Sequence, residues 1–357
     1  MHMLAEVVEL VIGVDTHKQT HTAAVVVAAT GAMITQVTVP ATPAGYRQLL
    51  QLARQQPGQR VWAIEGTGGY GAGLTRFLHG HAEQVVELDR PKRAARRHGA
   101  KSDPLDATRA AREALGRDHL AQPRAAGPRA ALQARLTARR SAVQAAGDAQ
   151  RQLHALVVAA PDALRDRLRG LTTRGLVTAC GRLRLRADWD IETSATAASL
   201  RALARRIQLL NVEIAEHTGA ITTLVRTWRP DLLNRCGVGP IVAATVLCAW
   251  SHPGRCRTDA AFAMLGGAAP IPASSGQTVR VRLNRSGDRQ LNQALHLIVL
   301  TRLRYDPATR AYAQRRRAQG KTNREIRRCL VRYVARQLYR LLEANPCFDP
   351  TEERPRE

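Results

Sequence analysis

The sequence predicts an N-terminal α/β domain followed by a long, mainly helical remainder. Residues 1–125 alternate short β-branched runs with segments of helical periodicity, which is the pattern of an α/β domain. From residue 126 onward Ala, Arg, Leu and Gln dominate, and apolar residues recur every three or four positions. With 357 residues, the chain is long enough for two or three domains and a sizeable core.

The order of the predicted elements in the first region indicates a particular fold. Three closely spaced β-branched runs predict an antiparallel meander: residues 9–15, 21–29 and 34–40. A helix starting at Thr42 and Pro43 follows, and after it come a strand, a helix, a strand and a helix: residues 61–65, 71–79, 83–89 and 101–115. This is the ribonuclease-H-like order, and it places Asp15 and Glu65 at the ends of adjacent central strands.

Four carboxylates are the candidate metal ligands of this region. Asp15 and Glu65 each end an apolar run, and Asp103 and Asp106 share one face of a predicted helix. Burying carboxylates at strand ends is costly unless a positive charge lies there, and oxygen ligands suit Mg²⁺ or Mn²⁺. Two such ions can serve phosphodiester chemistry. Taken singly, Asp103 before Pro104 can equally be a helix cap, and Asp15 a turn residue.

Residues 126–228 are expected to form a helical coiled-coil oligomerisation region. Two long segments, 132–157 and 200–225, carry apolar residues at helical spacing. Folding back on each other, or on a second copy of the chain, would bury these stripes. In the second segment the expected inner face comprises Leu203, Ile207, Leu210, Ile214, Ile221 and Leu224.

Residues 229–348 are expected to form a third, mostly helical domain, with residues 349–357 as a disordered tail. Gly237 and Gly239 surround a turn into an apolar helix and resemble a helix-hairpin-helix element, in which glycines let backbone N–H groups approach phosphate. The alternative is an ordinary loop entering a buried helix.

A Pro/Gly/Ser loop is the second feature of this third domain. Ser274 and Ser275 lie in it, and basic residues follow them: Arg280, Arg282, Arg285 and Arg289. Such a loop is usually a linker, and serine is a poor nucleophile unless it is activated. Arginines on one face of a short strand could hold a phosphate beside the hydroxyl.

The charge of the chain indicates a polyanionic partner. The formal net charge is +25, and residues 276–345 alone hold seventeen Lys and Arg against four Asp and Glu. Residues 324–346 predict a helix with an apolar inner face and basic residues elsewhere, among them Arg327, Arg332 and Arg336. Such residues supply affinity for phosphate and not base readout.

The six cysteines show no metal-ligand spacing, and no apolar run reaches the length of a membrane helix. The N-terminus is too short and too acidic for a signal peptide. We therefore expect reduced thiols in a cytoplasmic protein.

Three motifs, VIGVDTHK, AIEGTGGYG and KSDPLDA, resemble the blocks of the DEDD transposases of the IS110 insertion-sequence family. The resemblance extends over nearly the whole chain. It implies a RuvC-like N-terminal domain whose metal ligands are Asp15, Glu65, Asp103 and Asp106. Lys18 also matches a family position and is expected to contact nucleic acid.

The resemblance further implies a serine nucleophile in the C-terminal domain. The matching position is Ser275, with Ser274 as the alternative because the serine is doubled. It also implies donor and target DNA as substrates, a structured noncoding RNA encoded by the element as a guide, and assembly as a dimer or tetramer.

We therefore predict an insertion-sequence transposase or recombinase. The first alternative is a RuvC-like structure-specific nuclease in which the carboxylates activate water. A sugar kinase or ATPase of the actin-like fold would need a second glycine-rich phosphate hairpin, which the sequence lacks. A non-enzymatic DNA-binding protein does not explain acidic residues at strand ends.

Overall fold

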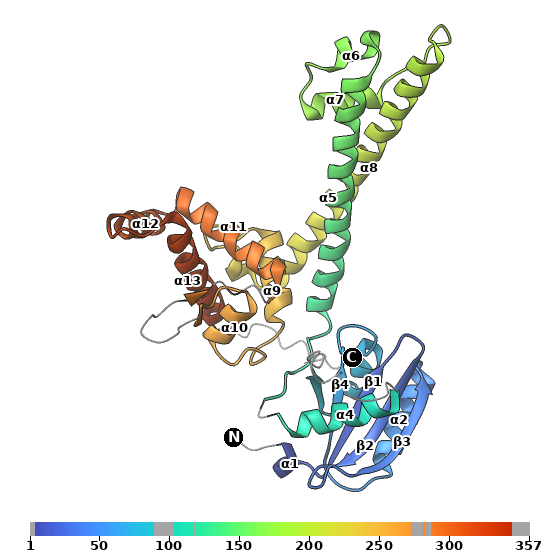
Figure 1. Cartoon of the computed structure of the whole chain (residues 1–357), viewed down its shortest axis with the longest axis vertical. Coiled ribbons are helices and arrows are strands. Elements are labelled where there is room, and N and C mark those ends of the chain that lie inside the picture. Colours follow the sequence, from blue (N-terminus) through green and yellow to red (C-terminus); the bar gives the residue numbers. More distant parts are fainter. Residues whose placement is uncertain are drawn as a thin grey trace, which may run out of the picture. The chain divides into compact units, whose positions relative to one another are not determined.

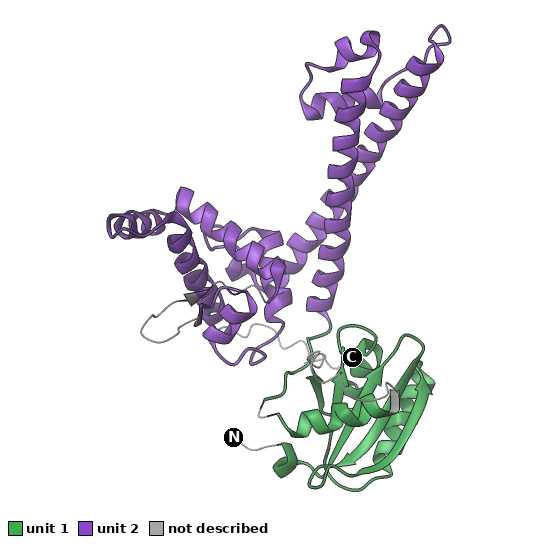
Figure 2. Cartoon of the chain, viewed as in Figure 1, with its two compact units in different colours: residues 1–126 green, residues 127–357 purple. Residues whose placement is uncertain are grey.

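The computed structural model describes residues 4–88, 103–117, 119–272, 281–282, 284 and 287–344, with only the backbone given at 103–104, 272 and 281. The chain divides into two compact units, residues 1–126 and residues 127–357 (Figure 2).

The first unit is built on one mixed five-stranded sheet in the order β3-β2-β1-β4-β5 (Figure 1). Its strands are β1 (Leu10–Thr16), β2 (Thr20–Val27), β3 (Met33–Pro40), β4 (Arg60–Glu65) and β5 (Val85–Leu88). The first three pair antiparallel as a meander, whereas β1–β4 and β4–β5 pair parallel. The mixed sheet and the helical remainder of the chain confirm the predicted class and are consistent with a ribonuclease-H-like domain.

Helices cover both faces of this sheet: α1 (Leu4–Val7), α2 (Pro43–Arg54), α3 (Ala72–His79) and α4 (Asp103–Leu115). The Thr42 side chain caps α2 by accepting a hydrogen bond from the Gly45 N–H, as the sequence predicts. Helices α2 and α3 pack in one core with Ile12 and Trp62, while α4 packs in the other. The sheet thus lies between two helical layers.

Gly13 lets α4 lie directly on the central strand β1. A Cβ atom at this position would be only 2.1 Å from the Ala107 carbonyl oxygen and 2.5 Å from the Ala111 nitrogen. Both are backbone atoms of α4, so the overlap could not be relieved by turning a side chain. The absence of a side chain at Gly13 therefore sets the distance between strand and helix.

The second unit is helical apart from the two-residue antiparallel strands β6 (Ile271–Pro272) and β7 (Val281–Arg282) in its described part. Its long helices are α5 (Pro128–Ala159) and α8 (Ile191–Trp228). Short helices α6 (Asp162–Leu168) and α7 (Thr173–Gly181) lie between them in sequence. The rest comprises a 3₁₀ turn, η2 (Pro230–Leu232), and α9 (Pro240–Trp250), α10 (Asp259–Leu265), α11 (Arg289–Tyr305), α12 (Pro307–Ala318) and α13 (Asn323–Ala344).

Helices α5 and α8 lie side by side and contribute to two separate cores (Figure 1). One core joins the later part of α5 to α6, α7 and the start of α8. The other joins the start of α5 and the end of α8 to α9–α13. Between Ile207 and Ile221, no residue of α8 is fully buried.

The predicted inner face of α8 is correct only in part. Ile207 and Ile221 are buried, but the other four predicted members are half-buried. The buried stripe instead includes Ala197, Leu200 and Ala204. Small alanines allow α5 to approach closely, so the contact runs along a line shifted from the large apolar residues.

An arginine that the sequence did not single out joins α8 to the end of α13. Arg229 is 1% exposed, and its guanidinium pairs with Asp231 at 2.6 Å. It also donates to the carbonyl oxygens of Leu341 (2.9 Å) and Leu342 (3.1 Å) in the last turn of α13. Part of the basic charge of this chain therefore serves the fold and not a partner.

No helix in the described ranges combines the length and the apolar character needed to cross a membrane.

We predict that Gly13→Ala destabilises the first unit by about 2–3 kcal/mol, because its methyl group overlaps the backbone of α4. Differential scanning calorimetry checks this. The control is Gly68→Ala, since nothing lies within 4 Å of a Cβ at Gly68. It should change stability by no more than about 0.5 kcal/mol. Equal melting temperatures for the two variants would disprove the close approach.

Candidate nuclease-like site and nucleic-acid surface

Asp15 and Glu65 occupy corresponding positions on two adjacent parallel strands, β1 and β4. The parallel register pairs Val14 with Ile64, so the next residues on the two strands are Asp15 and Glu65. The Thr16 hydroxyl donates to the Glu65 backbone oxygen at 2.9 Å and ties the two strand ends together. The first two predicted carboxylates therefore lie on adjacent strand ends.

Both carboxylates belong to the sheet face that carries α4. Val11 and Ala63 pack with α4, whereas the residues beside them, Ile12 and Ile64, pack in the opposite layer. Because side chains alternate along a strand, Asp15 takes the side of Val11 and Glu65 the side of Ala63.

The first turn of α4 lies toward the same end of the sheet. The Ala107 carbonyl meets Gly13, the middle residue of β1, while the later residues Ala110 and Ala114 pack in the core that contains Val8, just before β1. Helix α4 thus runs antiparallel to β1, and its N-terminal turn points to the strand ends. That turn begins at Asp103 and includes Asp106, which is one residue before the contact with Gly13.

The surroundings of these carboxylates differ. The Asp15 side chain is 14% exposed, and one of its oxygens lies 3.1 Å from the Nε2 atom of His17. The Asp106 side chain is 32% exposed and pairs with Arg109 at 3.3 Å. Sequence reasoning missed His17, although it lies in the same motif as Asp15. Lys18 is exposed in the turn between β1 and β2.

Carboxylate oxygens are the donor type that Mg²⁺ and Mn²⁺ prefer, so the chemistry of this set fits a hard divalent cation. Among the side chains that the structure describes, no three of His, Cys, Asp and Glu are close enough to hold an ion as they stand. The Asp103 side chain lies outside the described residues. The backbone arrangement provides one shared end for the donors, and their side chains would have to turn toward a common ion.

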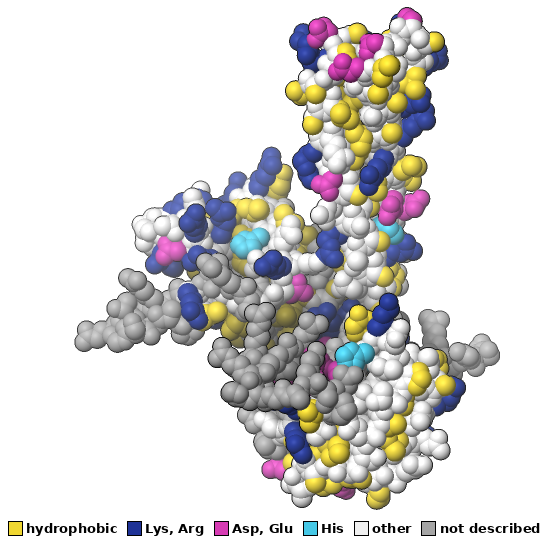
Figure 3. Space-filling model, turned by 45° about the vertical axis from the view of Figure 1, so that its right-hand side comes forward, with side chains coloured by type: hydrophobic (Ala, Val, Ile, Leu, Met, Phe, Trp, Pro, Cys, Tyr) yellow, Lys and Arg dark blue, Asp and Glu magenta, His cyan; other side chains and the backbone are white. Residues whose placement is uncertain are grey.

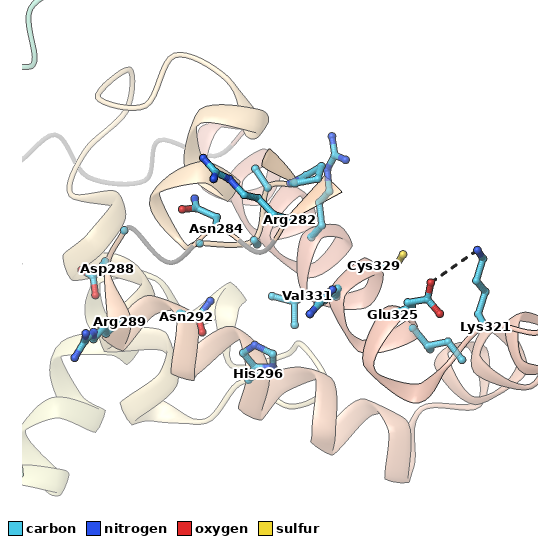
Figure 4. Close-up of a pocket in the computed structure, with 18 of the residues that line it drawn as sticks. Arg282, Asn284, Asp288, Arg289, Asn292, His296, Lys321, Glu325, Cys329 and Val331 are labelled. Atoms are coloured by element: carbon cyan, nitrogen blue, oxygen red, sulfur yellow. Dashed lines mark ion pairs between the residues drawn. The ribbon is translucent and has the colours of Figure 1, made fainter. Parts of the chain in front are cut away.

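The second unit contains a cavity of about 710 Å³ (Figure 4). Its walls come from α11, α13 and the segments around β6 and β7. Three of the predicted basic residues line it: Arg282, Arg289 and Arg332. Ser274, Ser275, Arg280 and Arg285 lie outside the described residues. Pro270 and Arg282, which flank the serine segment in sequence, both line the cavity.

The remaining predicted basic residues of α13 have different surroundings. Arg327 is exposed, whereas the Arg336 guanidinium donates to Asp259 at 2.8 Å, beside Arg340 at 2.9 Å. These guanidinium groups, Arg336 first, hold the pKa of the Asp259 carboxyl below its ordinary value. Arg336 thus connects α13 to α10, a structural contact that charge patterning did not reveal. Lys and Arg side chains nonetheless gather over the C-terminal helices (Figure 3).

The two glycines before α9 have different surroundings as well. Gly237 has a φ of +84°, and a Cβ there would be 2.9 Å from the Ile298 carbonyl of α11, so it is needed for backbone packing. Nothing lies within 4 Å of a Cβ at Gly239, the residue that precedes α9. Only Gly239 therefore leaves open space at the start of the helix.

Asn284, Asn292 and His296 line the cavity and were not predicted. Burial, together with the charge of Arg327, lowers the pKa of His296. The available signal was polar residues at helical spacing, Arg289, Asn292 and His296, on one face of a predicted helix.

Comparison with known families gives two matches. Residues 12–160 match the DEDD transposases of IS110, a model described as Transposase. Residues 231–314 match the model described as Transposase IS116/IS110/IS902 family.

Two insertion-element proteins are similar to the chain. One is the uncharacterized 42 kDa protein of insertion element IS900 from Mycobacterium paratuberculosis, 29% identical over 152 residues, 42% of this chain. The other is the uncharacterized 43.6 kDa protein of insertion element IS110 from Streptomyces coelicolor, 30% identical over 161 residues, 45% of this chain. Each matched stretch covers 38% of the relative, well under two thirds of its length.

The first family model covers most of the first unit and extends through α5 of the second unit, the other lies within the second unit, and together they match more than half of the chain. The resemblance found in the three N-terminal motifs is thereby confirmed. The chain belongs to the IS110 family of transposases.

Proposed function

We propose that this protein cuts and rejoins DNA as an insertion-sequence transposase. The observation that carries the proposal is the backbone arrangement at one end of β1, β4 and α4: Asp15 and Glu65 follow the paired residues Val14 and Ile64, and the first turn of α4 contains Asp103 and Asp106. At such a site a bound Mg²⁺ or Mn²⁺ pair supplies charge stabilisation and a more acidic oxygen nucleophile. The four carboxylates would hold the ions, and α4 would keep two of them at fixed spacing.

In the proposed reaction the Ser275 hydroxyl attacks a DNA phosphodiester. A new phosphorus–oxygen bond forms to the serine oxygen, one phosphorus–oxygen bond of the DNA breaks, and the serine proton passes to the departing DNA oxygen. The phosphoserine ester is close in energy to the bond it replaces, so rejoining needs no external energy source. This suits an enzyme that exchanges strands.

Arginines around the cavity would hold the phosphate during this exchange. Arg282 and Arg289 lie next to the serine segment in sequence and on the cavity wall in the structure. Guanidinium groups bind phosphate oxygens with two parallel hydrogen bonds and carry no base preference. For Arg280, Arg285 and Arg327 we propose the same phosphate-binding role, and for Lys18 and Gly239 contacts to the DNA backbone.

We further propose that a structured noncoding RNA from the element guides the choice of DNA, and that the protein acts on the bacterial nucleoid. The net charge of +25 supports a polyanionic partner but does not distinguish RNA from DNA. Competition of the element's RNA against yeast tRNA, at fixed salt, tests this part. Equal competition would exclude a specific guide.

The alternative function is a metal-dependent nuclease in which the carboxylates activate water and Ser275 does not react. The same strand-end carboxylates favour it, since two ions can serve either nucleophile. The two functions differ in the intermediate. Only the transposase forms a covalent bond between protein and DNA.

We predict that Asp15→Asn, Glu65→Gln and Asp106→Asn each lower Mg²⁺-dependent DNA cleavage at least about 100-fold, because each removes a metal ligand. Cleavage of a labelled element-end duplex measures the effect. Glu113→Gln is the control, since Glu113 lies later on α4 and pairs with Arg117. Wild-type rates in all three variants would exclude the carboxylate site.

We predict that Ser275→Ala binds DNA normally and forms no covalent adduct, whereas Ser274→Ala forms it. Denaturing gels of labelled DNA, after incubation with each variant, detect the adduct. A band that persists in Ser275→Ala and disappears in Ser274→Ala would transfer the role to Ser274. No band from wild-type protein that still cleaves DNA would favour the nuclease.

We propose that α5 and α8 form a coiled coil that joins chains into a dimer or tetramer. In support, α8 exposes Leu209 (73%) and Val212 (57%) in the stretch with no fully buried residue. Replacing both with Glu should shift the full chain toward monomer in sedimentation velocity. An unchanged oligomer would remove this face from the interface.

A further inference from the structure

The cavity of the second unit is formed by two helix faces with matching polar spacing. Arg289, Asn292 and His296 lie three and four residues apart on α11. Glu325, Arg328 and Arg332 have similar spacing on α13. Residues at such intervals share one face of a helix, and both faces line the cavity (Figure 4).

The lining also has an apolar part. Ala268, Ala269, Pro270, Ile326 and Val331 contribute it, beside the polar residues of the two helices. A volume of about 710 Å³ is within the range of roughly 300–1,000 Å³ that encloses an organic ligand. The cavity therefore has enough volume and apolar surface to hold a flat ring in addition to an anion.

The charge on the walls is positive, because six Lys and Arg side chains line the cavity against two carboxylates among the described residues. The two carboxylates of the lining are already engaged: Asp288 accepts from the Gln290 and Leu291 N–H groups, and Glu325 accepts from Thr322 and faces Lys321 at 3.9 Å.

By contrast, the five arginines that line the cavity form no ion pair within 4 Å among the described residues: Arg282, Arg289, Arg316, Arg328 and Arg332. The Nε atom of Arg332 is buried and has no hydrogen-bond partner in the described structure. A buried donor without an acceptor costs free energy, which an anion in the cavity would recover.

Two groups on α11 are suited to hydrogen bonds with a neutral ring. The Asn292 amide nitrogen donates to the Gly266 carbonyl at 2.7 Å, which fixes the side chain and leaves its amide oxygen as an acceptor. Burial and the neighbouring Arg327 favour the neutral form of His296, which offers one donor and one acceptor. Such groups recognise the edge of an unpaired base.

We propose that this cavity binds one unpaired nucleotide of a single nucleic-acid strand. The arginines hold its phosphate, the apolar wall contacts the base, and Asn292 and His296 meet the base edge. A paired and stacked base cannot enter without leaving the duplex, so the site selects opened strands. This proposal rests on the proposed function, and it specifies the form in which the substrate reaches the C-terminal unit.

Fluorescence anisotropy with the full chain tests the proposal. The probes are a short labelled thymidine strand, the same length of abasic sugar-phosphate, and a blunt duplex. Arg328→Gln combined with Arg332→Gln should weaken binding of the thymidine strand about tenfold and of the duplex about twofold or less. The control combines Arg205→Gln with Arg206→Gln, two exposed arginines of α8 outside the cavity. It removes the same charge and should change both affinities about twofold or less.

A second variant separates a base contact from general electrostatics. His296→Ala should reduce the preference for the thymidine strand over the abasic strand, while a structural defect would weaken both equally. A uridine strand, compared in parallel, shows whether the cavity prefers RNA or DNA. A loss of affinity in the double arginine variant that is larger for either single strand than for the duplex supports the site.

Equal losses for single strand and duplex, or no difference from the α8 control, would overturn the proposal. The covalent adduct at Ser275, measured on the same variants, tests the proposed function separately. Wild-type protein that forms the adduct but fails the anisotropy test retains its function without this site. Selective strand binding without an adduct supports the site and contradicts the serine mechanism.

Discussion

The contact between Gly13 and α4 is the constraint on which the candidate site depends. Because Gly13 has no side chain, the backbone of α4 lies directly against the middle of β1. This contact brings the first turn of α4 to the level of Asp15 and Glu65. A larger residue would lift the helix from the sheet and separate the carboxylates of α4 from those of the strands. Packing and chemistry therefore depend on the same residue.

Arginine has at least two roles in this chain. Arg229 is buried and holds the last turn of α13, and Arg336 pairs with Asp259 across two helices. Such residues contribute to the net charge without being available to a polyanion. Arg328 and Arg332 form no ion pair within 4 Å in the described part of the chain, and the cavity they line supplies a physical reason for the difference. Charge alone therefore overestimates the binding surface.

Much of the first unit could be predicted, because period-two patterns and turn residues are local signals. Examples are the end of β4 at Glu65, the end of β1 one residue after Asp15, and the Thr42 cap of α2. The buried stripe of α8 was predicted less well, since Ala197 and Ala204 carry little hydrophobic signal but allow close helix packing. The role of Arg336 depends on Asp259, 77 residues away, and no local pattern reveals such a pair.

In the candidate sites, too, local sequence signals predicted some residues, whereas others depend on contacts between distant parts of the chain. Three-residue spacing and strand ends identified the carboxylates, and the parallel register brings two of them to neighbouring positions. The cavity forms where the faces of α11 and α13 meet. The sequence alone therefore did not indicate that His296 and Asn292 line a common cavity. The contact between His17 and Asp15 was not predicted, because a histidine in a turn usually faces solvent.

The central claim is that the end of β1, β4 and α4 binds divalent cations. Electron paramagnetic resonance of the full chain titrated with Mn²⁺ tests it most directly, since free and bound ions give different signals. We expect saturable binding that is lost when Asp15→Asn is combined with Glu65→Gln and is retained in Glu113→Gln. Saturable binding that is unchanged in the double variant, or no binding by the wild-type chain, would contradict the account.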